Sequence, residues 1–325
     1  MYLERHLAFQ LRRAVQARRP VLVQGPREAG KTTLVRHEFP DHAYLTLDDP
    51  AVRRDPAAAL RRIRGPAIVD AIHRAPALIG LESPHIYVSS LRLVTQVPVL
   101  ELHPPTRAER QHRPALPLET LGRFAPSTRP PAGDPQPWPV NLAFLDLDLP
   151  AMIRVHDRAL FERFLQHAEA RSGAILDQQS LARELGVSHR TVVRWLEVLH
   201  AAFQIVLPPY QESFGRRIIQ RQKMHFLCGA ESFESEVVSE IHRNARHAGL
   251  APELRYWRDS NGLELQLVAD GVPVGIAAEA NPRVEAAVLR WAELAGRPKA
   301  ALITRKAPPS DRREGRLLRY AVGQI

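Results

Sequence analysis

The strongest chemical pattern in the chain is the segment 25–32, Gly-Pro-Arg-Glu-Ala-Gly-Lys-Thr. It matches the phosphate-binding pattern G-x-x-x-x-G-K-[ST] at every fixed position. An apolar run, residues 21–23, precedes it and a helix-prone stretch, residues 33–36, follows it. In this context glycines let backbone N–H groups turn toward an anion, and the helix start adds a positive dipole end. We therefore predict a nucleotide-binding loop made of Gly25, Pro26, Arg27, Glu28, Ala29, Gly30, Lys31, Thr32 and Thr33.

Three residues have defined roles around such a loop. Lys31 would reach the β- and γ-phosphates of the nucleotide, and the hydroxyl of Thr32 would bind Mg²⁺. Asp70 ends the apolar run 67–69, which is where a Mg²⁺-organising aspartate lies, at the carboxyl end of a strand beside the loop. The alternative for Asp70 is a strand-end aspartate that caps the next helix. The predicted metal site is thus Thr32 with Asp70.

Hydrolysis requires a group that polarises the attacking water, and the sequence lacks the usual one. Many ATPases carry a glutamate directly after the metal-binding aspartate. This chain has Ala71 there, which can neither accept a proton nor orient water. His73 could take that role, or it is an ordinary surface histidine. Ser89 and Ser90 end the next expected strand, where a polar residue could sense the γ-phosphate, although serine is also common at strand ends.

Composition limits the class of protein. The 325 residues allow two or three domains, and the hydrophobic fraction of 45% is ordinary for a globular chain. The single cysteine, Cys228, excludes a disulfide framework within one chain. Because no secretory signal or membrane-length apolar run is visible, we expect a cytoplasmic protein with no membrane partner. The net charge of +10 favours nucleic acid as a partner, although an arginine-rich composition alone would also produce it.

Hydrophobic patterns predict an α/β unit over residues 1–103. Residues 3–18 have the spacing of an amphipathic helix. Helical segments separate several of the expected strands, which is typical of βαβ units and a mainly parallel sheet. These strands are expected at residues 21–24, 43–47, 67–70, 86–89 and 97–102.

A proline-rich stretch follows this unit. Ten of the 28 prolines fall between residues 104 and 139. Proline removes backbone donors and fixes φ, so neither helix nor sheet core is expected there. We interpret residues 104–142 as a linker or extended surface arm, with a short helix at residues 116–124.

Residues 143–222 have the pattern of a helix-turn-helix domain. After an amphipathic helix at residues 158–170, the segment 178–196 offers two apolar helix faces separated by Gly186, with Ser188 as the N-cap of the second helix. Segments 203–208 and 210–219 would form the hairpin of a winged helix, with Arg216 and Arg217 at its tip. The unit would contact DNA, or it serves only in packing or protein contacts. The residues predicted to point toward DNA are His189, Arg190 and Arg194.

Several longer motifs resemble one family, the bacterial and archaeal AAA-type ATP-binding proteins with a C-terminal DUF4143 domain. The resemblance rests on residues 24–33, 44–50, 70, 74–76, 188–189, 207–210, 214–217 and 256–262. It implies an AAA+-like core that binds ATP with Mg²⁺, a winged helix, and a small α/β domain at residues 223–325 similar to PD-(D/E)xK nucleases. The fold class expected is therefore α/β with a P-loop parallel sheet followed by these two domains.

The chain departs from this family where catalysis would occur. Besides the change to Ala71, the segment after Ser90 is shorter than in the family and lacks the family's arginine, for which Arg92 could substitute. In the nuclease-like domain, carboxylate and lysine positions are taken by Gln266, Gly275 and Ala277, which offer neither hard metal ligands nor a base. The remaining acidic candidates there are Glu234, Glu240, Glu264 and Glu279.

These departures favour an ATP-binding protein, nominally an ATPase, in which hydrolysis is weak or lost and the nuclease-like domain is inactive. The alternative is a DNA-binding regulator that the nucleotide switches through the winged helix. A third possibility is a remnant without activity. The shortened segment after the fourth strand also exposes sheet surface, which the proline-rich stretch or a partner in a homo-oligomer would cover.

Overall fold

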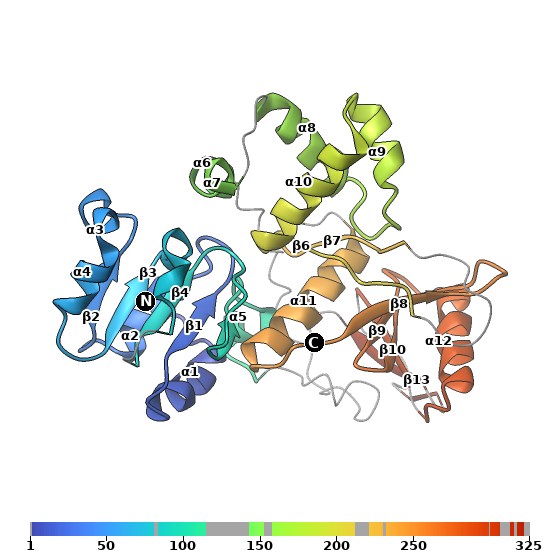
Figure 1. The fold of residues 1–325 in the computed structure, drawn as a ribbon. Helices are drawn as coiled ribbons and strands as arrows, with labels where there is room; N and C mark the ends of the chain where they lie inside the picture. Colours follow the sequence, from blue (N-terminus) through green and yellow to red (C-terminus); the bar gives the residue numbers. More distant parts are fainter. Residues whose placement is uncertain are drawn as a thin grey trace.

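The structure, a computed structural model, describes residues 2–80, 84–114, 143–152, 158–211, 221–229, 232–298, 300–305, 313–314 and 317–321. The described residues form an α/β protein in three parts: a parallel sheet, a helical middle, and a mixed sheet (Figure 1). Among the described helices, none has the length and apolarity needed to cross a lipid bilayer.

The N-terminal sheet is parallel in all its pairings, in the order β2-β3-β4-β1-β5. All five predicted strands are confirmed, and the three central ones, β3, β4 and β1, are buried over most of their length. Their bounds are β1 Val21–Gln24, β2 Ala43–Thr46, β3 Ala67–Asp70, β4 Ile86–Ser89 and β5 Val99–Glu101. The carboxyl ends of β1, β3 and β4 therefore lie along one edge of the sheet.

Helix α1 precedes the first strand, and three further helices and two short 3₁₀ turns lie between the strands. The helices are α1 Leu7–Gln16, α2 Lys31–Glu38, α3 Pro50–Arg54 and α4 Pro56–Arg61, and the turns are Ile72–Arg74 and Pro76–Leu78. Helix α1 is shorter than the predicted 3–18. It begins late because Arg5 is buried in a polar network and the backbone N–H of His6 donates to Glu109 Oε1 at 2.8 Å.

The start of the proline-rich stretch is not an exposed arm. Residues 102–109 are buried, and α5 (Arg107–Arg110) begins there. Thr106 and Glu109 form a capping box, in which each side chain accepts the other's backbone N–H, so two donors at the start of the helix are satisfied. The linker interpretation is therefore wrong for this part. The predicted helix at 116–124 lies outside the described residues.

The helical middle contains the predicted helix-turn-helix. Its helices are α6 Ala143–Leu147, α7 Leu149–Met152, α8 Arg158–Glu169, α9 Gln178–Leu185 and α10 His189–Ala201. Gly186 ends α9 with φ +68°, and Ser188 accepts the N–H of Thr191 at 3.1 Å, so both predicted turn residues are confirmed. One apolar core joins all five helices, including Phe144 and Trp195.

The predicted wing pairs differently. Strand β6 (Ile205–Val206) pairs antiparallel with β7 (His225–Phe226), not with residues 210–219. Tyr210 instead forms a bridge to Tyr256, and residues 212–220, with Arg216 and Arg217, lie outside the described residues. The apolar side of β7 explains the pairing, because Phe226 is buried in the helical core.

The C-terminal part is a mixed sheet between two helices. The strand order is β12-β13-β11-β10-β9-β8, with the two-residue β12 at one edge. Helix α11 (Phe233–His247) and helix α12 (Pro282–Leu294) pack against separate apolar clusters of this sheet. Figure 1 shows α11 between this sheet and the N-terminal part. The strands are β8 Leu254–Arg258, β9 Glu264–Ala269, β10 Val272–Ile276, β11 Ala300–Thr304, β12 Arg313–Glu314 and β13 Leu317–Ala321.

Gly25 gives a first test of how tightly the loop after β1 is packed. A Cβ at this position would lie 1.9 Å from the carbonyl oxygen of Leu102, whereas one on Gly65 meets nothing within 4 Å. Both glycines have positive φ, +153° and +92°. We expect Gly25→Ala to lower the free energy of unfolding by about 3 kcal/mol or more, and Gly65→Ala by about 1 kcal/mol. Urea denaturation of both variants measures the difference, and equal losses would contradict the close packing.

Candidate functional site

The loop between β1 and α2 surrounds a hollow at the carboxyl edge of the parallel sheet. The N–H of Gly25 donates to Ser89 O at 3.2 Å, which ties the loop to the end of β4. Gly30, with φ +90°, precedes the first turn of α2. The hollow has a volume of about 480 Å³, and its wall consists of Arg27, Glu28, Gly30, Lys31, Thr32, Thr33, Tyr44, Asp48, Asp70, Ala71, His73 and Ser90. Most of the predicted loop residues therefore line one depression.

Lys31 lies in the wall of this hollow with only 7% of its surface exposed. Its Nζ donates to the carbonyl oxygen of Pro26 at 2.7 Å. Burial lowers the pKa of Lys31 to about 8, and the charge of Asp70 opposes part of that shift. A buried ammonium held by one carbonyl gains more from an incoming anion than an exposed one does, because less water must be displaced.

The two predicted metal ligands are adjacent. Thr32 Oγ1 donates to Asp70 Oδ2 at 2.7 Å, and the backbone N–H of Ala71 donates to Oδ1 at 2.7 Å. Tyr44 also donates to Asp70 Oδ2, at 2.8 Å, and burial raises the pKa of this tyrosine to about 12. A carboxylate beside a hydroxyl is a donor set of the kind that Mg²⁺ accepts, together with water and phosphate oxygens. The alternative role for Asp70 is that of a helix cap. The described contact of that kind is the hydrogen bond that Asp70 accepts from the backbone N–H of Ala71.

The wall contains no carboxylate at residue 71. Ala71 is 4% exposed, lines the hollow, and has φ +56°. His73 also lines the hollow and is not a surface histidine, since its side chain is 5% exposed. Burial lowers the pKa of His73, so its imidazole is neutral near pH 7. Arg92 does not take the place of the missing arginine, because it pairs with Glu101 Oε1 at 2.7 Å.

One residue of this region was missed in the sequence. Asp148 lies between α6 and α7 and is 1% exposed. Arg27 donates to both of its carboxylate oxygens, from Nε at 3.0 Å and from Nη2 at 2.6 Å. Ser90 Oγ donates to Asp148 Oδ1 at 3.1 Å, and His73 Nε2 lies 3.8 Å from the same oxygen. No spacing or motif announces this contact, which joins residues 121 positions apart.

The predicted DNA-facing residues lie on the start of α10. His189, Arg190 and Arg194 are all exposed. His189 Nε2 is 3.0 Å from Gln178 Oε1 of α9, so it also joins the two helices of the motif. The opposite face of α10 is buried through Val192, Trp195 and Leu196, which leaves the arginine side directed outward.

The remaining acidic residues of the C-terminal part do not converge as a set. Glu234 and Glu264 meet at one ammonium group, with Lys223 Nζ at 2.6 Å and 2.5 Å from their carboxylates. Burial raises the pKa of Glu234 to about 7, against the opposing charge of Lys223. Glu240 lies elsewhere, paired with Arg243 at 3.0 Å, and Glu279 is exposed. Gln266 accepts the N–H of Ile276 and Gly275 lies under α12, so both are structural.

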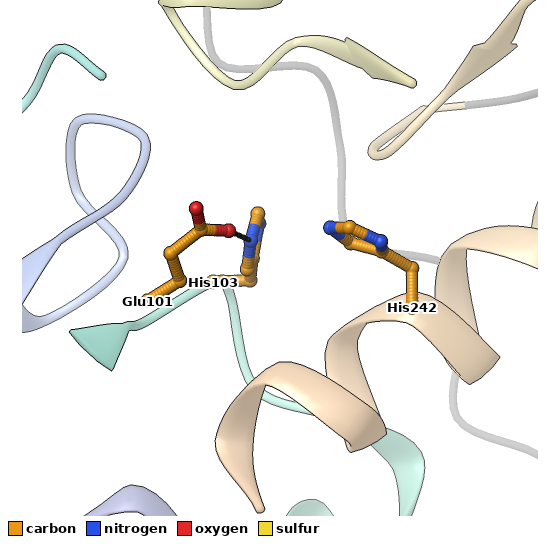
Figure 2. A group of neighbouring side chains, drawn as sticks. All are labelled: Glu101, His103 and His242. Atoms are coloured by element: carbon orange, nitrogen blue, oxygen red, sulfur yellow. Dashed lines mark hydrogen bonds and ion pairs between the residues drawn. The ribbon is translucent and has the colours of Figure 1, made fainter. Parts of the chain in front are cut away.

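A second group of possible metal ligands, Glu101, His103 and His242, lies between β5 and α11 (Figure 2). It does not suit a metal ion. Glu101 Oε1 accepts from Arg92 at 2.7 Å, and Arg246 Nε is 3.1 Å from Oε2, so both oxygens already face guanidinium groups. A divalent ion would add charge beside two partly buried arginines. We interpret the group as part of a polar interface.

Comparisons with known proteins identify distant relatives but assign no function. Residues 142–227 match the model of a domain of unknown function, DUF8612. The chain is similar to Uncharacterized protein Rv2008c of Mycobacterium tuberculosis and Uncharacterized protein Mb2031c of Mycobacterium bovis. Each is 27% identical over an alignment that covers 96% of this chain and 76% of the relative. The relationship is distant, and it extends over nearly all of this chain and about three quarters of each relative.

His242 provides a prediction about pH. Both ring nitrogens lack a hydrogen-bond partner among the described residues, and burial holds the pKa of His242 well below its usual value. Unfolding lets the imidazole bind a proton below about pH 6.5, so stability falls as the pH falls. We expect His242→Leu to preserve stability at pH 7.5 and to reduce its loss toward pH 5 by up to about 1.4 kcal/mol per pH unit.

Urea denaturation at several pH values measures this effect. His189→Leu is the matched control, because that histidine is exposed in the folded state. An unchanged pH dependence of stability in His242→Leu would show that the imidazole of His242 does not cause the loss of stability at low pH.

Proposed function

We propose that this protein binds ATP with Mg²⁺ in the hollow beside the loop of residues 25–32. The observation that supports this most directly is the arrangement of Lys31, Thr32 and Asp70 around one cavity at the carboxyl edge of a parallel sheet. That edge is where open α/β sheets bind ligands. The choice of ATP over other nucleotides, and an AAA-type assignment, come from the family resemblance.

Each residue would contribute separately to binding. The backbone N–H groups of the loop and the start of α2 would hold phosphate oxygens. Lys31 would exchange the Pro26 carbonyl for the β- and γ-phosphates. The hydroxyl of Thr32, which donates to Asp70 Oδ2 at 2.7 Å, would turn away from that carboxylate so that both residues could hold Mg²⁺.

Hydrolysis would be slow. The position next to Asp70 offers only the methyl group of Ala71, and the neutral His73 lies against Asp148. Loss of a general base costs roughly 10²–10⁴-fold in rate while binding persists. The protein is thus proposed to be a nominal ATPase that binds better than it hydrolyses.

The first prediction of this proposal concerns Lys31. Lys31→Ala should abolish the binding of a fluorescent ATP analogue in the presence of Mg²⁺, because it removes the buried cation. Arg61→Ala, an exposed cation on α4, is the control and should bind as the unchanged chain does. Fluorescence titration of folded proteins makes the comparison. Normal binding by Lys31→Ala, or no binding by the unchanged chain, would contradict the nucleotide site.

The C-terminal part is proposed to be an inactive nuclease-like domain. Its two neighbouring carboxylates, Glu234 and Glu264, are bridged by the buried ammonium of Lys223. An ammonium there neutralises the charge that would otherwise attract a divalent ion. This arrangement supports a structural role.

A second candidate function is DNA binding switched by the nucleotide. The exposed arginines at the start of α10 favour it, as does the helix-turn-helix geometry around Gly186 and Ser188. A recognition helix places its N-terminal residues against base edges in the major groove. The net charge of +10 would add a salt-dependent attraction to phosphates.

DNA binding is tested by charge reversal on α10. Arg190→Glu combined with Arg194→Glu should weaken duplex binding by tenfold or more and flatten its salt dependence, since each lost phosphate contact lowers the slope by about one. Arg183→Glu, an exposed arginine of α9, is the control. Fluorescence anisotropy at several salt concentrations provides the measurement. Equal effects of the control and the double variant would refute a role for α10.

A further inference from the structure

Among the described residues of the helical part, Asp148 is the buried carboxylate that contacts the loop after β1. It lies at the junction of α6 and α7, whose residues Phe144, Leu145 and Leu149 belong to the apolar core of the helix-turn-helix part. The loop and the helical part therefore meet through an ion pair with both partners largely shielded from water: the side chain of Arg27 is 19% exposed and that of Asp148 is 1% exposed.

We propose that Asp148 is a positioning residue for the nucleotide site: it fixes the guanidinium of Arg27 so that this group contacts the phosphates. This proposal rests on the proposed nucleotide binding. It makes the site a composite, in which the sheet supplies the loop and Mg²⁺ ligands and the helical part orients one cation.

Arg27 and Asp148 form a pair with two hydrogen bonds. A guanidinium has five N–H donors in one plane, and Asp148 accepts from two of them, Nε and Nη2. Two parallel bonds fix the orientation of the plane as well as its position. The same side chain lines the hollow beside Lys31 and Thr32, so the orientation is set at the place where phosphates would lie.

A long arginine side chain left without Asp148 would lose this orientation. Holding such a chain in one rotamer costs conformational entropy, and Asp148 removes that cost before the ligand arrives. Ser90 also donates to Asp148 at 3.1 Å, so the carboxylate joins the end of β4 to the same arrangement. Arg27, Asp148 and Ser90 form one unit.

The chain that follows Ser90 links this unit to the C-terminal end of α10. Two residues beyond Ser90, the N–H of Arg92 donates to the carbonyl oxygen of Ala201, the last residue of α10, at 2.8 Å. The helical part thus touches the hollow's neighbourhood through Asp148 and through the end of α10. Nucleotide affinity should consequently depend on how the helical part is docked.

A double-mutant cycle tests the proposal with a fluorescent ATP analogue and Mg²⁺ on the full chain. Arg27→Ala and Asp148→Ala should each weaken binding by about tenfold or more, as expected for loss of a charge-assisted contact. The double variant should bind no more weakly than Arg27→Ala, because Asp148 acts only through Arg27. Asp148→Asn, which keeps one acceptor oxygen, should lie between the unchanged chain and Asp148→Ala.

Asp146→Ala is the matched control. Asp146 lies on the same α6 helix but is exposed, and it pairs with Arg158 instead of the loop. Its removal should leave the affinity unchanged. Circular dichroism confirms folding, and if Asp148→Ala does not fold, Asp148→Asn takes its place in the cycle.

The outcomes separate the two proposals. Independent, additive effects of Arg27→Ala and Asp148→Ala would overturn the positioning role. Tighter binding by Asp148→Ala would also overturn it, since Asp148 would then compete with phosphate for Arg27. Failure of the unchanged chain to bind the analogue would instead overturn the proposed function itself.

Discussion

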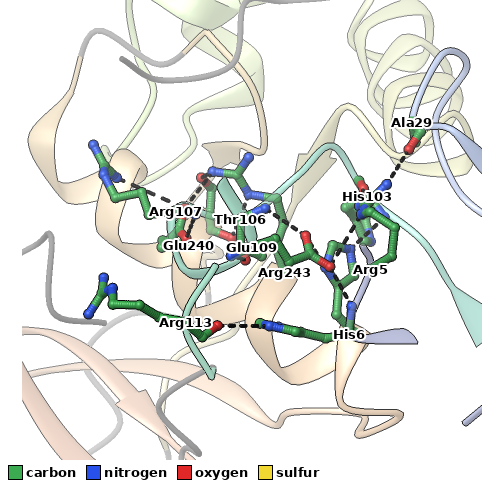
Figure 3. Close-up of polar contacts among 12 residues, drawn as sticks. Arg5, His6, Ala29, His103, Thr106, Arg107, Glu109, Arg113, Glu240 and Arg243 are labelled. Atoms are coloured by element: carbon green, nitrogen blue, oxygen red, sulfur yellow. Dashed lines mark hydrogen bonds and ion pairs between the residues drawn. The ribbon is translucent and has the colours of Figure 1, made fainter. Parts of the chain in front are cut away.

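The carboxylate of Glu109 holds the N-terminal sheet and the C-terminal part together (Figure 3). It accepts the backbone N–H of His6 and of Thr106, lies 3.2 Å from Arg5 Nε, and lies 3.1 Å from His247 Nδ1 of α11. Burial alone would raise the pKa of Glu109, but the charges and hydrogen bonds of these partners hold it below its usual value. Because an unpaired buried charge is costly, the segments that supply these partners are fixed relative to one another.

This network also determines the position of the loop between β1 and α2. Arg5 donates from Nη1 to the carbonyl oxygen of Ala29 at 2.8 Å and from Nη2 to that of His103 at 2.6 Å. One contact to the loop comes from Arg5, which precedes α1, and a second comes from Asp148, which pairs with Arg27. Protein contacts on both sides therefore maintain the shape of the loop.

Local patterns predicted the local features of this fold. The apolar runs gave the five parallel strands, and the roles of Gly186 and Ser188 followed from turn and cap chemistry. The Lys31 and Asp70 side of the hollow was likewise predictable, because the motif and the strand end share one sheet edge. Contacts such as Arg27 with Asp148 could not be predicted, since partner choice over 121 residues depends on how α6 and α7 pack.

The pairing of β6 with β7 brings the end of the helical middle back to its apolar core. Met224 and Phe226 complete its apolar core, and the residues that match the domain family, 142–227, end one residue after β7. A fragment cut at residue 222 would lose the second strand and expose the apolar side of Ile205. The segment is nevertheless joined to its neighbour, because Val206 of β6 and Leu227 belong to the apolar cluster beneath α11. A domain of this family placed in another protein would need an apolar surface to cover these two side chains.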